Sequence, residues 1–546
     1  MAGDEQARAA SAAEMRGAAA TGRLTASSLT VAALIVAAGF LGSRLLGLLR
    51  NVAIAHAFGT DPELDAFWVG IRLPDLAFQL ISGATLASAF MPTFARVREE
   101  RGVQESWRLA SSVLNLVLLA TIVFAAVIFV LAPEVVPLLA PGLGEDIGRG
   151  AELQGLAVDL TRIMLASSVL FSVSGMSMGI LNAQRRFLTP ALAPMLYNLS
   201  LIVAALVSDD ARVLAAGVVA GAALHLAVQL PDLMLAGMAY RLVADWKDAA
   251  ARQVAALMAP RVLGLAASQV NFYLIAIFFA SSLEAGAIST VSFAWLIVMT
   301  PVGIIGMAIS TAAFPTLAEQ AARNDARLVE TLRSTLRLIL FLSLPAGLGL
   351  ALLAKAVVVV LLQRGAFDAG SSELTARALQ LYAPALFAHC GIEILSRGYY
   401  ALADTRTPVV FAVASMLLNL GLAAALVGPL EVRGVALALS MATTAEFLAL
   451  LLVLGRRLPR LVDASLRDGL GRMLLSGSIL AAVTAAAGFG LTEGAGLDTG
   501  DGPQALLVLA GAGGLGGAAY LAAAALLGLG EGAEVLLRVR AVFARR

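Results

Sequence analysis

Residues Gly42–Pro92 read GSRLLGLLRNVAIAHAFGTDPELDAFWVGIRLPDLAFQLISGATLASAFMP, and this stretch decides what fold the chain can adopt. Most of it is as apolar as a membrane span, yet it carries five charged residues: Arg44, Arg50, Asp65, Arg72 and Asp75. A charge at bilayer depth costs at least about 2.5–3.5 kcal/mol on insertion scales, so such residues usually face a cavity and mark a pathway. Pro74 and the glycines supply the breaks that a bent membrane helix needs. The stretch therefore predicts two helices that line the substrate cavity of a transporter.

The rest of the chain has the composition of a membrane protein. Of its 546 residues, 60% are hydrophobic and 14% are charged, and apolar runs long enough to span a bilayer recur from end to end. The single cysteine, Cys390, excludes a disulfide framework and a cysteine metal site. No Gly-Lys pair occurs, so there is no Walker A loop for ATP hydrolysis. The net charge of +1 gives no reason to expect a nucleic-acid partner.

Counting about 20 apolar residues per span predicts an all-α polytopic membrane protein with about fourteen transmembrane helices. The predicted spans are 28–56, 63–93, 107–132, 155–183, 187–207, 211–239, 252–282, 286–316, 333–361, 375–402, 407–428, 432–454, 470–491 and 504–528. The stretch 133–141 is expected to be a loop or a short interfacial helix. Residues 1–26 are polar, basic and rich in alanine, and we interpret them as a disordered cytoplasmic tail. A cleavable signal peptide is the alternative.

Basic residues are concentrated in every second connection between the predicted spans. With the N-terminus inside, the cytoplasmic connections hold clusters such as Arg96, Arg98 and Arg101, or Arg456, Arg457 and Arg460. The opposite connections hold acids such as Asp61, Glu63, Asp209, Asp210, Glu493 and Asp498. The exceptions are Arg149, Arg212, Arg364 and Arg433. A missed helix would scramble this pattern, so it predicts an even number of spans with both termini in the cytoplasm.

Three landmarks recur in the same order along the chain. AFMP ends at Pro92 and AFP at Pro315, an offset of 315 − 92 = 223; Pro190 and Pro408 are 218 apart, and Asn198 and Asn419 are 221 apart. This predicts two pseudo-symmetric six-helix lobes, residues 27–245 and 246–458, related by an axis along the membrane normal. Residues 459–546 then hold two further helices and a cytoplasmic tail. No connection is long enough for a soluble catalytic domain, which favours a transporter over an enzyme.

The charges of the opening stretch fall into a recognisable pattern. Asp65, Arg72 and Gln79 are spaced by seven and share one helical stripe, and Asp75 lies one turn from Arg72 and could pair with it. Arg44 and Arg50 lie about 120° apart on an ideal helix, but the glycines near them make a distortion plausible. A guanidinium holds phosphate oxygens bidentately. We therefore predict a cationic cavity for an anionic headgroup, with these substrate-binding residues: Arg44, Arg50, Asp65, Arg72 and Gln79. Snorkelling arginines or a structural ion pair with Asp65 or Asp75 would explain the same charges.

Weaker signals lie in other predicted spans. His389, Glu393 and Arg397 are spaced by four, which fits a proton or ion relay or, as the favoured interpretation, a structural ion pair. Asn198 and Asn419 are expected to form interhelical hydrogen bonds. Only three histidines occur in the chain, so no histidine-rich metal site is expected.

Six motifs stand out along the chain: SRLLGLLRNVAIAHAFGTDPELDAFWVGIRLPDL (Ser43–Leu76), ASAFMPTF (Ala87–Phe94), GILNAQRRFLTPALAPMLYN (Gly179–Asn198), QLPDL (Gln229–Leu233), LLQRGAFD (Leu361–Asp368) and SRGYYALADTRTPV (Ser396–Val409). They extend over about 370 residues, well beyond what general hydropathy explains. Together they resemble the MurJ (MviN) family of lipid II flippases, in the superfamily of multidrug, oligosaccharidyl-lipid and polysaccharide exporters.

The resemblance implies a bacterial cytoplasmic-membrane protein that flips an undecaprenyl-pyrophosphate-linked precursor to the outer leaflet for peptidoglycan synthesis. It implies alternating access of two lobes, a groove for the lipid tail formed by the last two helices, and no cofactor. The pyrophosphate would meet Arg44 and Arg50, and Asp65 would shape or gate the cavity. We expect the chain to act as a monomer. Family transport is linked to the membrane potential, and a monovalent cation is implicated in some members, but the sequence assigns no site to it.

The chain also departs from the family pattern. Phe78 and Gln79 stand where many relatives carry two arginines, Gly83 replaces a usual carboxylate, and no arginine occurs in Phe293–Pro301. Ala423 stands where an acidic sodium ligand is expected. The cavity is thus less cationic than usual, which leaves two alternatives open: a flippase for another polyprenyl-linked oligosaccharide, and a cation-coupled antiporter of the same superfamily.

Overall fold

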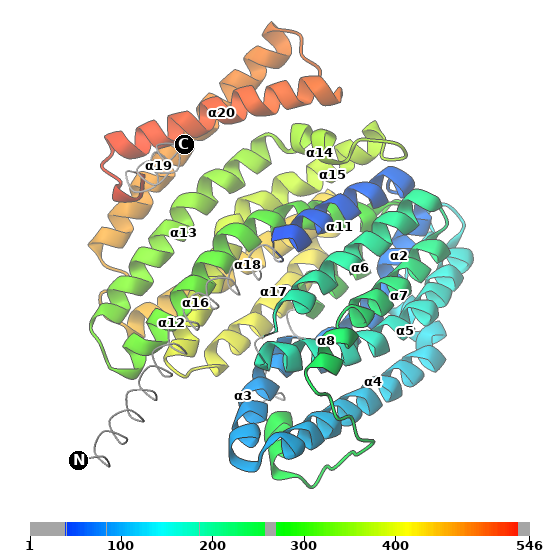
Figure 1. Cartoon of the computed structure of the whole chain (residues 1–546). Coiled ribbons are helices and arrows are strands. Elements are labelled where there is room, and N and C mark those ends of the chain that lie inside the picture. Colours follow the sequence, from blue (N-terminus) through cyan, green and yellow to red (C-terminus); the bar gives the residue numbers. More distant parts are fainter. Residues whose placement is uncertain (1–38, 40, 83, 185, 257–268, 533–546) are drawn as a thin grey trace, which may run out of the picture. The chain divides into compact units, whose positions relative to one another are not determined.

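The computed structural model describes residues 39, 41–82, 84–184, 186–256 and 269–532, and helices fill most of them (Figure 1). No strand occurs in these ranges, so the all-α prediction is confirmed for them. The predicted tail 1–26 lies outside the described residues. The first helix includes residues 41–58. The α-helices that follow are α2 (Pro62–Ala77), α3 (Ala84–Arg101), α4 (Val103–Leu139), α5 (Gly150–Ala183), α6 (Leu188–Val207), α7 (Ala211–Ala227), α8 (Leu230–Leu235), α10 (Ile275–Ala280), α11 (Ala287–Pro301), α12 (Ala308–Ala322), α13 (Arg327–Leu352), α14 (Ala354–Leu362), α15 (Ala369–Tyr382), α16 (Leu386–Ala401), α17 (Arg406–Leu430), α18 (Val432–Arg457), α19 (Ala464–Phe489) and α20 (Gly502–Leu526).

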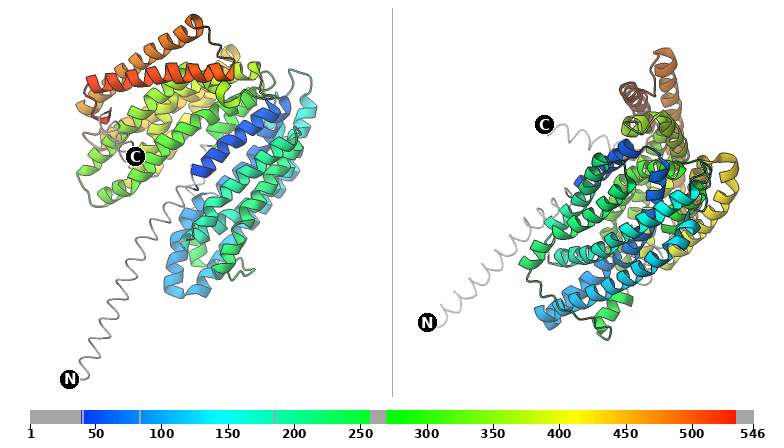
Figure 2. Two further views of the ribbon diagram at one scale, coloured as in Figure 1. Left: turned by 45° about the horizontal axis from the view of Figure 1, so that its top comes forward. Right: turned by 90° about the vertical axis from the view of Figure 1, so that its right-hand side faces the viewer.

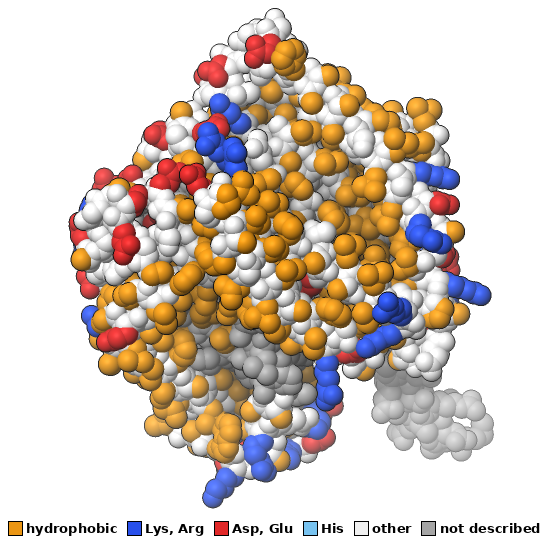
Figure 3. All heavy atoms as spheres, turned by 180° about the vertical axis from the view of Figure 1, so that it is seen from behind, with side chains coloured by type: hydrophobic (Ala, Val, Ile, Leu, Met, Phe, Trp, Pro, Cys, Tyr) orange, Lys and Arg blue, Asp and Glu red, His pale blue; other side chains and the backbone are white. Residues whose placement is uncertain are grey.

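Within the described ranges, 11 helical segments are long and apolar enough to cross a membrane. They match eleven of the predicted spans. The other three, 28–56, 63–93 and 252–282, each include residues outside the described ranges, so the count of fourteen stays a prediction. Apolar side chains cover much of the face shown in Figure 3, as expected for a surface in contact with lipid. The chain is a multi-pass membrane protein.

Two helix boundaries differ from the prediction. α4 continues to Leu139 with Pro133 and Pro137 inside it, where we expected a loop or a short interfacial helix. Membrane helices tolerate internal prolines when other groups satisfy the freed carbonyls. The predicted span 333–361 is broken at Leu353, which has φ −103° and ψ 18°. Beyond this turn, Lys355 lies 3.7 Å from Glu373 and forms an ion pair with it. The charge of Lys355, which falls inside the predicted apolar span, is therefore paired.

Contacts divide the chain into two compact units, and we describe each by itself. The first unit includes residues 1–51, 77–127 and 163–260, and the second includes 52–76, 128–162 and 261–546. The first helix, α4 and α5 thus belong partly to each unit. The lobe boundaries predicted near residues 245 and 458 remain a prediction.

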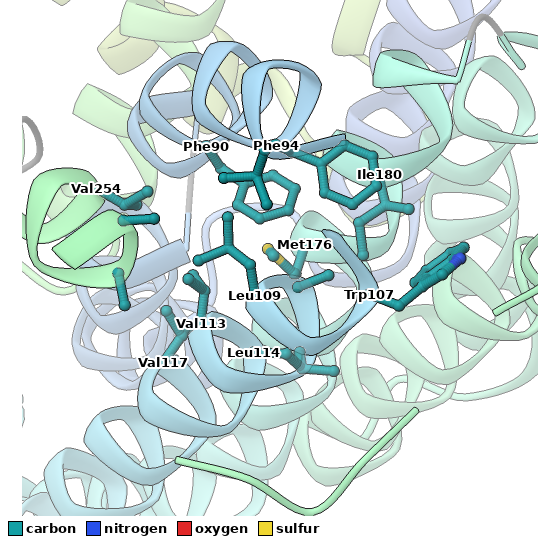
Figure 4. Packing of buried hydrophobic residues seen from close by; sticks show 14 of the residues in the cluster. Phe90, Phe94, Trp107, Leu109, Val113, Leu114, Val117, Met176, Ile180 and Val254 are labelled. Carbon is teal, nitrogen blue, oxygen red and sulfur yellow. The ribbon is translucent and has the colours of Figure 1, made fainter. Parts of the chain in front are cut away.

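A cluster of buried apolar side chains forms a core of the first unit (Figure 4). Phe90 and Phe94 of α3 pack at a ring-centroid distance of 5.3 Å, and Phe94 meets Trp107 of α4 at 6.1 Å. Met176 and Ile180 of α5 complete the cluster. Close packing of this kind fixes α3, α4 and α5 against one another.

In the second unit, α19 and α20 pack against α13 and α14 (Figures 1 and 2). The Tyr520 hydroxyl donates a hydrogen bond to the Phe341 carbonyl at 2.8 Å. Arg337 Nε donates to Glu531 Oε1 at 2.5 Å, with both side chains largely buried. α20 and the residues that follow it are therefore fastened to α13 by polar contacts as well as by apolar packing.

Four π-helical segments occur in the described chain: Phe78–Ser82, Val270–Leu274, Val302–Met307 and Gly490–Gly494. Such segments are rare and are frequent at functional sites. The segments at Phe78 and Val302 begin 302 − 78 = 224 positions apart, close to the offsets of the sequence landmarks. The π turn thus recurs at corresponding places in the predicted second and eighth helices, which supports the duplication.

Equivalent asparagines support the duplication as well. Asn198 Nδ2 donates to the Ser43 carbonyl at 3.3 Å. Asn419 Nδ2 donates to the Asn271 carbonyl at 3.1 Å and to Asn271 Oδ1 at 2.9 Å. In each half, the fifth predicted helix is thereby bound to the first, which confirms the predicted interhelical hydrogen bonds. Inside an apolar bundle, these hydrogen bonds satisfy polar groups that would find no partner among the lipid tails.

Candidate functional site

Asp65 lies in the first turn of α2 and binds the start of α11 with its carboxylate. Its side chain is buried, with 3% of the residue exposed. Oδ2 accepts a hydrogen bond from the Gly286 N–H at 2.8 Å, and Oδ1 accepts from the Ser289 N–H at 2.7 Å and the Ser289 hydroxyl at 2.5 Å. The first N–H groups of a helix have no partner within the helix, and its dipole attracts negative charge there. Asp65 therefore caps α11 and ties it to the start of α2.

The chain beside Asp65 is packed backbone against backbone. A Cβ atom on Gly286 (φ +89°) would lie 2.3 Å from the Thr60 carbonyl oxygen, and one on Gly59 (φ +59°) would lie 2.4 Å from that of Ala366. The Ala366 N–H donates to the His56 carbonyl at 2.9 Å. We call the contacts among residues 56–65, 286–289 and 365–371 the seal. Both halves of the duplication contribute to it, since residues 56–65 precede the repeat boundary and the other two segments follow it.

Replacing Gly286 with alanine is expected to destabilise the seal. The left-handed conformation costs a non-glycine residue roughly 1–2 kcal/mol, and the new methyl group would also meet the Thr60 backbone. Thermal unfolding of the purified protein measures the effect. Gly237 is the matched control, because it also has a positive φ (+76°) but nothing within 4 Å of an added Cβ. An equal loss of stability in Gly237→Ala and Gly286→Ala would show that the close backbone approach is unimportant.

The remaining predicted site residues are divided between the units. Arg44, Arg50 and Gln79 belong to the first unit, and Asp65 and Arg72 belong to the second. Arg44 is exposed. Arg50 is half-buried, and Nη2 donates to Asn51 Oδ1 at 3.3 Å, while its buried Nε meets no acceptor among the described residues. The helix is regular from 41 to 58, so the predicted distortion between the two arginines is absent there.

Arg72 forms the ion pair expected for it. Its guanidinium lies 4.0 Å from Asp75 and 5.5 Å from the centre of the Trp68 ring, and 11% of its side chain is exposed. Trp68 in turn meets Phe293 edge-on at 6.2 Å. Because Arg72 is packed between these groups, its charge is held in place by both a carboxylate and an aromatic face.

Phe78 and Phe293 both pack against other aromatic side chains. Phe78 lies 4.9 Å from Phe171, measured between ring centroids, within the first unit. Phe293 is buried and meets Phe367 at 5.5 Å in the second unit. Both residues are therefore held in aromatic clusters.

The predicted pair in α16 is present. Arg397 Nη1 lies 2.5 Å from Glu393 Oε2, and Arg397 Nη2 donates to Thr311 Oγ1 at 2.9 Å. His389 packs edge-on against Trp295 at 5.2 Å. A closed Glu–Arg pair bonded to a neighbouring helix matches the structural interpretation of this motif.

Sequence reasoning missed Glu446, a partly buried acid within α18. Between Arg433 and Arg456 it carries the only charge in the sequence of α18. A lone carboxyl group in the middle of an apolar span is the signal that would have found it.

Comparisons with known proteins place these features in a family. The family model described as lipid II flippase MurJ matches residues 54–496. The lipid II flippase MurJ of Burkholderia cenocepacia is 31% identical over 387 residues, which cover 69% of this chain and 74% of the relative. The probable lipid II flippase MurJ of Buchnera aphidicola is 30% identical over 415 residues, covering 75% of this chain and 80% of the relative.

Solved structures show the same fold. A lipid II flippase MurJ in an inward closed conformation matches with a TM-score of 0.75 and 23% identity, over 90% of this chain and 98% of the other. An inward-facing multidrug resistance MATE transporter of the MOP superfamily matches with a TM-score of 0.64 and 15% identity, over 78% of this chain and 96% of the other. At these identities the likeness concerns the fold alone.

Proposed function

Since the chain belongs to the MurJ family of lipid II flippases, we propose that it moves lipid II from the inner to the outer leaflet of the bacterial cytoplasmic membrane. The observation that carries the proposal is the family match across residues 54–496, which includes the seal and the capping carboxylate of Asp65. The protein is then a transporter rather than a catalyst, and its substrate is the undecaprenyl-pyrophosphate-linked peptidoglycan precursor. A monomer suffices for this mechanism, and a coupled monovalent cation stays a prediction without a site.

We place both termini in the cytoplasm, following the distribution of basic residues, so that the seal lies at the outer face of the membrane. There it joins the outer ends of the second and eighth predicted helices. A headgroup that enters from the cytoplasm would meet a closed outer side. Release to the outer leaflet would then require the Asp65 carboxylate to leave Gly286 and Ser289.

Arg44 and Arg50 supply the chemistry for a pyrophosphate. A guanidinium presents a planar fork of N–H donors that matches two phosphate oxygens, and it stays charged at any physiological pH. Arg44 is exposed, and Arg50 has a donor, Nε, that meets no acceptor among the described residues. Arg72 and Gln79 complete the proposed set on the second helix, with Arg72 held by Asp75 and Trp68.

A flippase for another polyprenyl-linked oligosaccharide is the second candidate. The packing of Phe78 against Phe171 favours it, because this position adds no guanidinium to the pyrophosphate site. The shared polyprenyl-pyrophosphate would still bind the arginines.

Complementation tests the proposal. The chain is expressed in a bacterium depleted of its own lipid II flippase, and lipid II at the outer leaflet is measured by its accessibility to an externally added lipid II-degrading enzyme. We expect growth and outer-leaflet lipid II to be restored. If the well-expressed protein restores neither, while the host's own flippase does so from the same vector, lipid II is not the substrate. Transport of another polyprenyl-pyrophosphate glycan into vesicles would then support the second candidate.

A further inference from the structure

Two ion pairs at corresponding positions of the two halves have opposite polarity. In the first half, Arg186 precedes α6 and its Nη1 lies 3.0 Å from Asp232 Oδ1, at the end of the sixth predicted helix. In the second half, Asp404 precedes α17 and pairs with Arg457, the last residue of α18. Asp404 follows Arg186 by 404 − 186 = 218 positions, the same offset as Pro408 from Pro190. Asp232 and Arg457 are 457 − 232 = 225 positions apart, so the two hairpins carry the arginine and the aspartate in reversed order along the chain.

A threonine accompanies each pair. Thr189 Oγ1 donates to Asp232 Oδ2 at 2.7 Å. Thr407, again 218 positions later, donates from Oγ1 to Asp404 Oδ2 at 2.6 Å, and its hydroxyl accepts from Arg457 Nη2 at 3.2 Å. Each threonine hydroxyl binds the aspartate of its own ion pair. Asp232 follows Thr189 in the sequence, whereas Asp404 precedes Thr407. Each half thus contains an arginine, an aspartate and a threonine that bind one another at the same end of a helical hairpin.

Further hydrogen bonds hold the charged groups of both pairs in place. For Asp404, partial burial works to raise the pKa, but hydrogen bonds from Thr407, Arg457 and Arg406 outweigh it and hold the pKa below its usual range. Arg186 also donates from Nη2 to the Leu235 carbonyl at 3.2 Å, which fixes the guanidinium beside Asp232. Each pair lies within a single unit of the structure.

The topology explains what such a pair can do. α6 and α7 are joined by the short connection 208–210, and α17 and α18 by Glu431 alone. The other ends of each hairpin have no direct covalent link and lie about 30 Å away along the helices. Each ion pair closes this open end, because one joins the start of α6 to α8, which follows α7 directly, and the other joins the start of α17 to the end of α18.

We propose that Arg186–Asp232 and Asp404–Arg457 are one latch in two polarities, which positions each hairpin so that it moves as a single piece during transport. This rests on the proposed function for its transport readout. The reversal of charge between the halves means that the pairing itself matters, and the sign at either position does not.

Charge exchange tests the latch directly. The variants are Asp232→Arg, Arg186→Asp and the double variant that carries both, which gives the first half the polarity of the second. Asp404→Arg, Arg457→Asp and their double variant form the mirror set. We expect each single reversal to lower lipid II transport per folded molecule severalfold, and each double exchange to restore most of it. Glu319→Arg is the control, since it reverses one charge of an exposed pair whose members are one helical turn apart, and it should have little effect.

Thermal unfolding of the same purified variants separates positioning from stability. If the single reversals lower the melting temperature but leave transport per folded molecule unchanged, the contact is only structural and the positioning role is overturned. A double exchange that performs no better than its single reversals would also overturn it. Should a reversal fail to accumulate, Asp232→Asn replaces it, because it removes the charge without creating repulsion. If the wild type moves no lipid II, the proposed function fails, and recovery of thermal stability by the double exchange still tests the pairing.

Discussion

Replacing Arg44 or Arg50 with alanine is expected to abolish lipid II transport while the protein remains folded in the membrane. A hydrogen bond to a charged group is worth about 1.5–3 kcal/mol. Since each 1.4 kcal/mol is a factor of about ten, the loss of one guanidinium should weaken pyrophosphate binding by about ten- to a hundredfold. Arg44 is exposed and Arg50 is half-buried, so truncation should cost little stability. Cells depleted of their own flippase should then fail to grow on either variant.

The measurement is outer-leaflet lipid II per molecule of folded flippase. Arg50→Lys separates charge from geometry, because it keeps the charge and removes the planar fork. We expect it to retain only part of the transport. Arg323→Ala is the matched control, since Arg323 is an exposed arginine that pairs with Glu319 one helical turn away. Full transport in both alanine variants would rule out the assignment of these two residues to the substrate site.

Replacing Asp65 with asparagine is expected to open the seal and to stop productive transport. Asparagine has nearly the same shape, but its amide group must turn an N–H toward the Gly286 N–H or the Ser289 N–H. A buried donor left without an acceptor costs about 1–3 kcal/mol, which shifts the equilibrium toward the open seal by roughly tenfold or more. A transporter that cannot hold its outer side closed cannot complete the cycle from the inner leaflet.

Cysteine labelling can report the state of the seal. The one native cysteine, Cys390, is buried, so Cys390→Ser gives a background in which Thr60→Cys is the single thiol. We expect an impermeant maleimide to label this thiol about ten times faster when Asp65→Asn is added. Glu319→Gln is the control, because the Glu319 side chain is 61% exposed and its ion-pair partner, Arg323, lies one helical turn away. If Asp65→Asn changes neither the labelling rate nor growth, Asp65 has no role in closure.

Local patterns in the sequence were sufficient for much of the structure. The length of the apolar runs predicted the membrane spans found in the described residues. The spacing of charged residues by three or four positions predicted the ion pairs Arg72–Asp75 and Glu393–Arg397. Helix geometry fixes such neighbours without knowledge of the fold. The repeated asparagines were predictable for a related reason, because a polar amide in an apolar span needs a partner on another helix.

Long-range and single-residue features could not be predicted in this way. The partners of Asp65 lie 221 and 224 positions along the chain, and nothing in its own helix indicates them. A π turn needs only one extra residue, which leaves hydropathy unchanged. The turn at Leu353 was missed because the residues around it are apolar apart from Lys355, and one lysine did not interrupt the predicted span. Family likeness indicated that Asp65 was important, but only the three-dimensional arrangement shows what it binds.

The π turns carry information about the history of the chain. Because those at Phe78–Ser82 and Val302–Met307 share the offset of the duplicated landmarks, a single ancestral half already possessed the turn before its gene doubled. Arg44 and Arg50 have no basic counterparts 218–224 positions later, so the predicted cationic chemistry belongs to the first half alone. The π turn is therefore common to both halves, whereas the chemistry proposed for the substrate is carried by one of them.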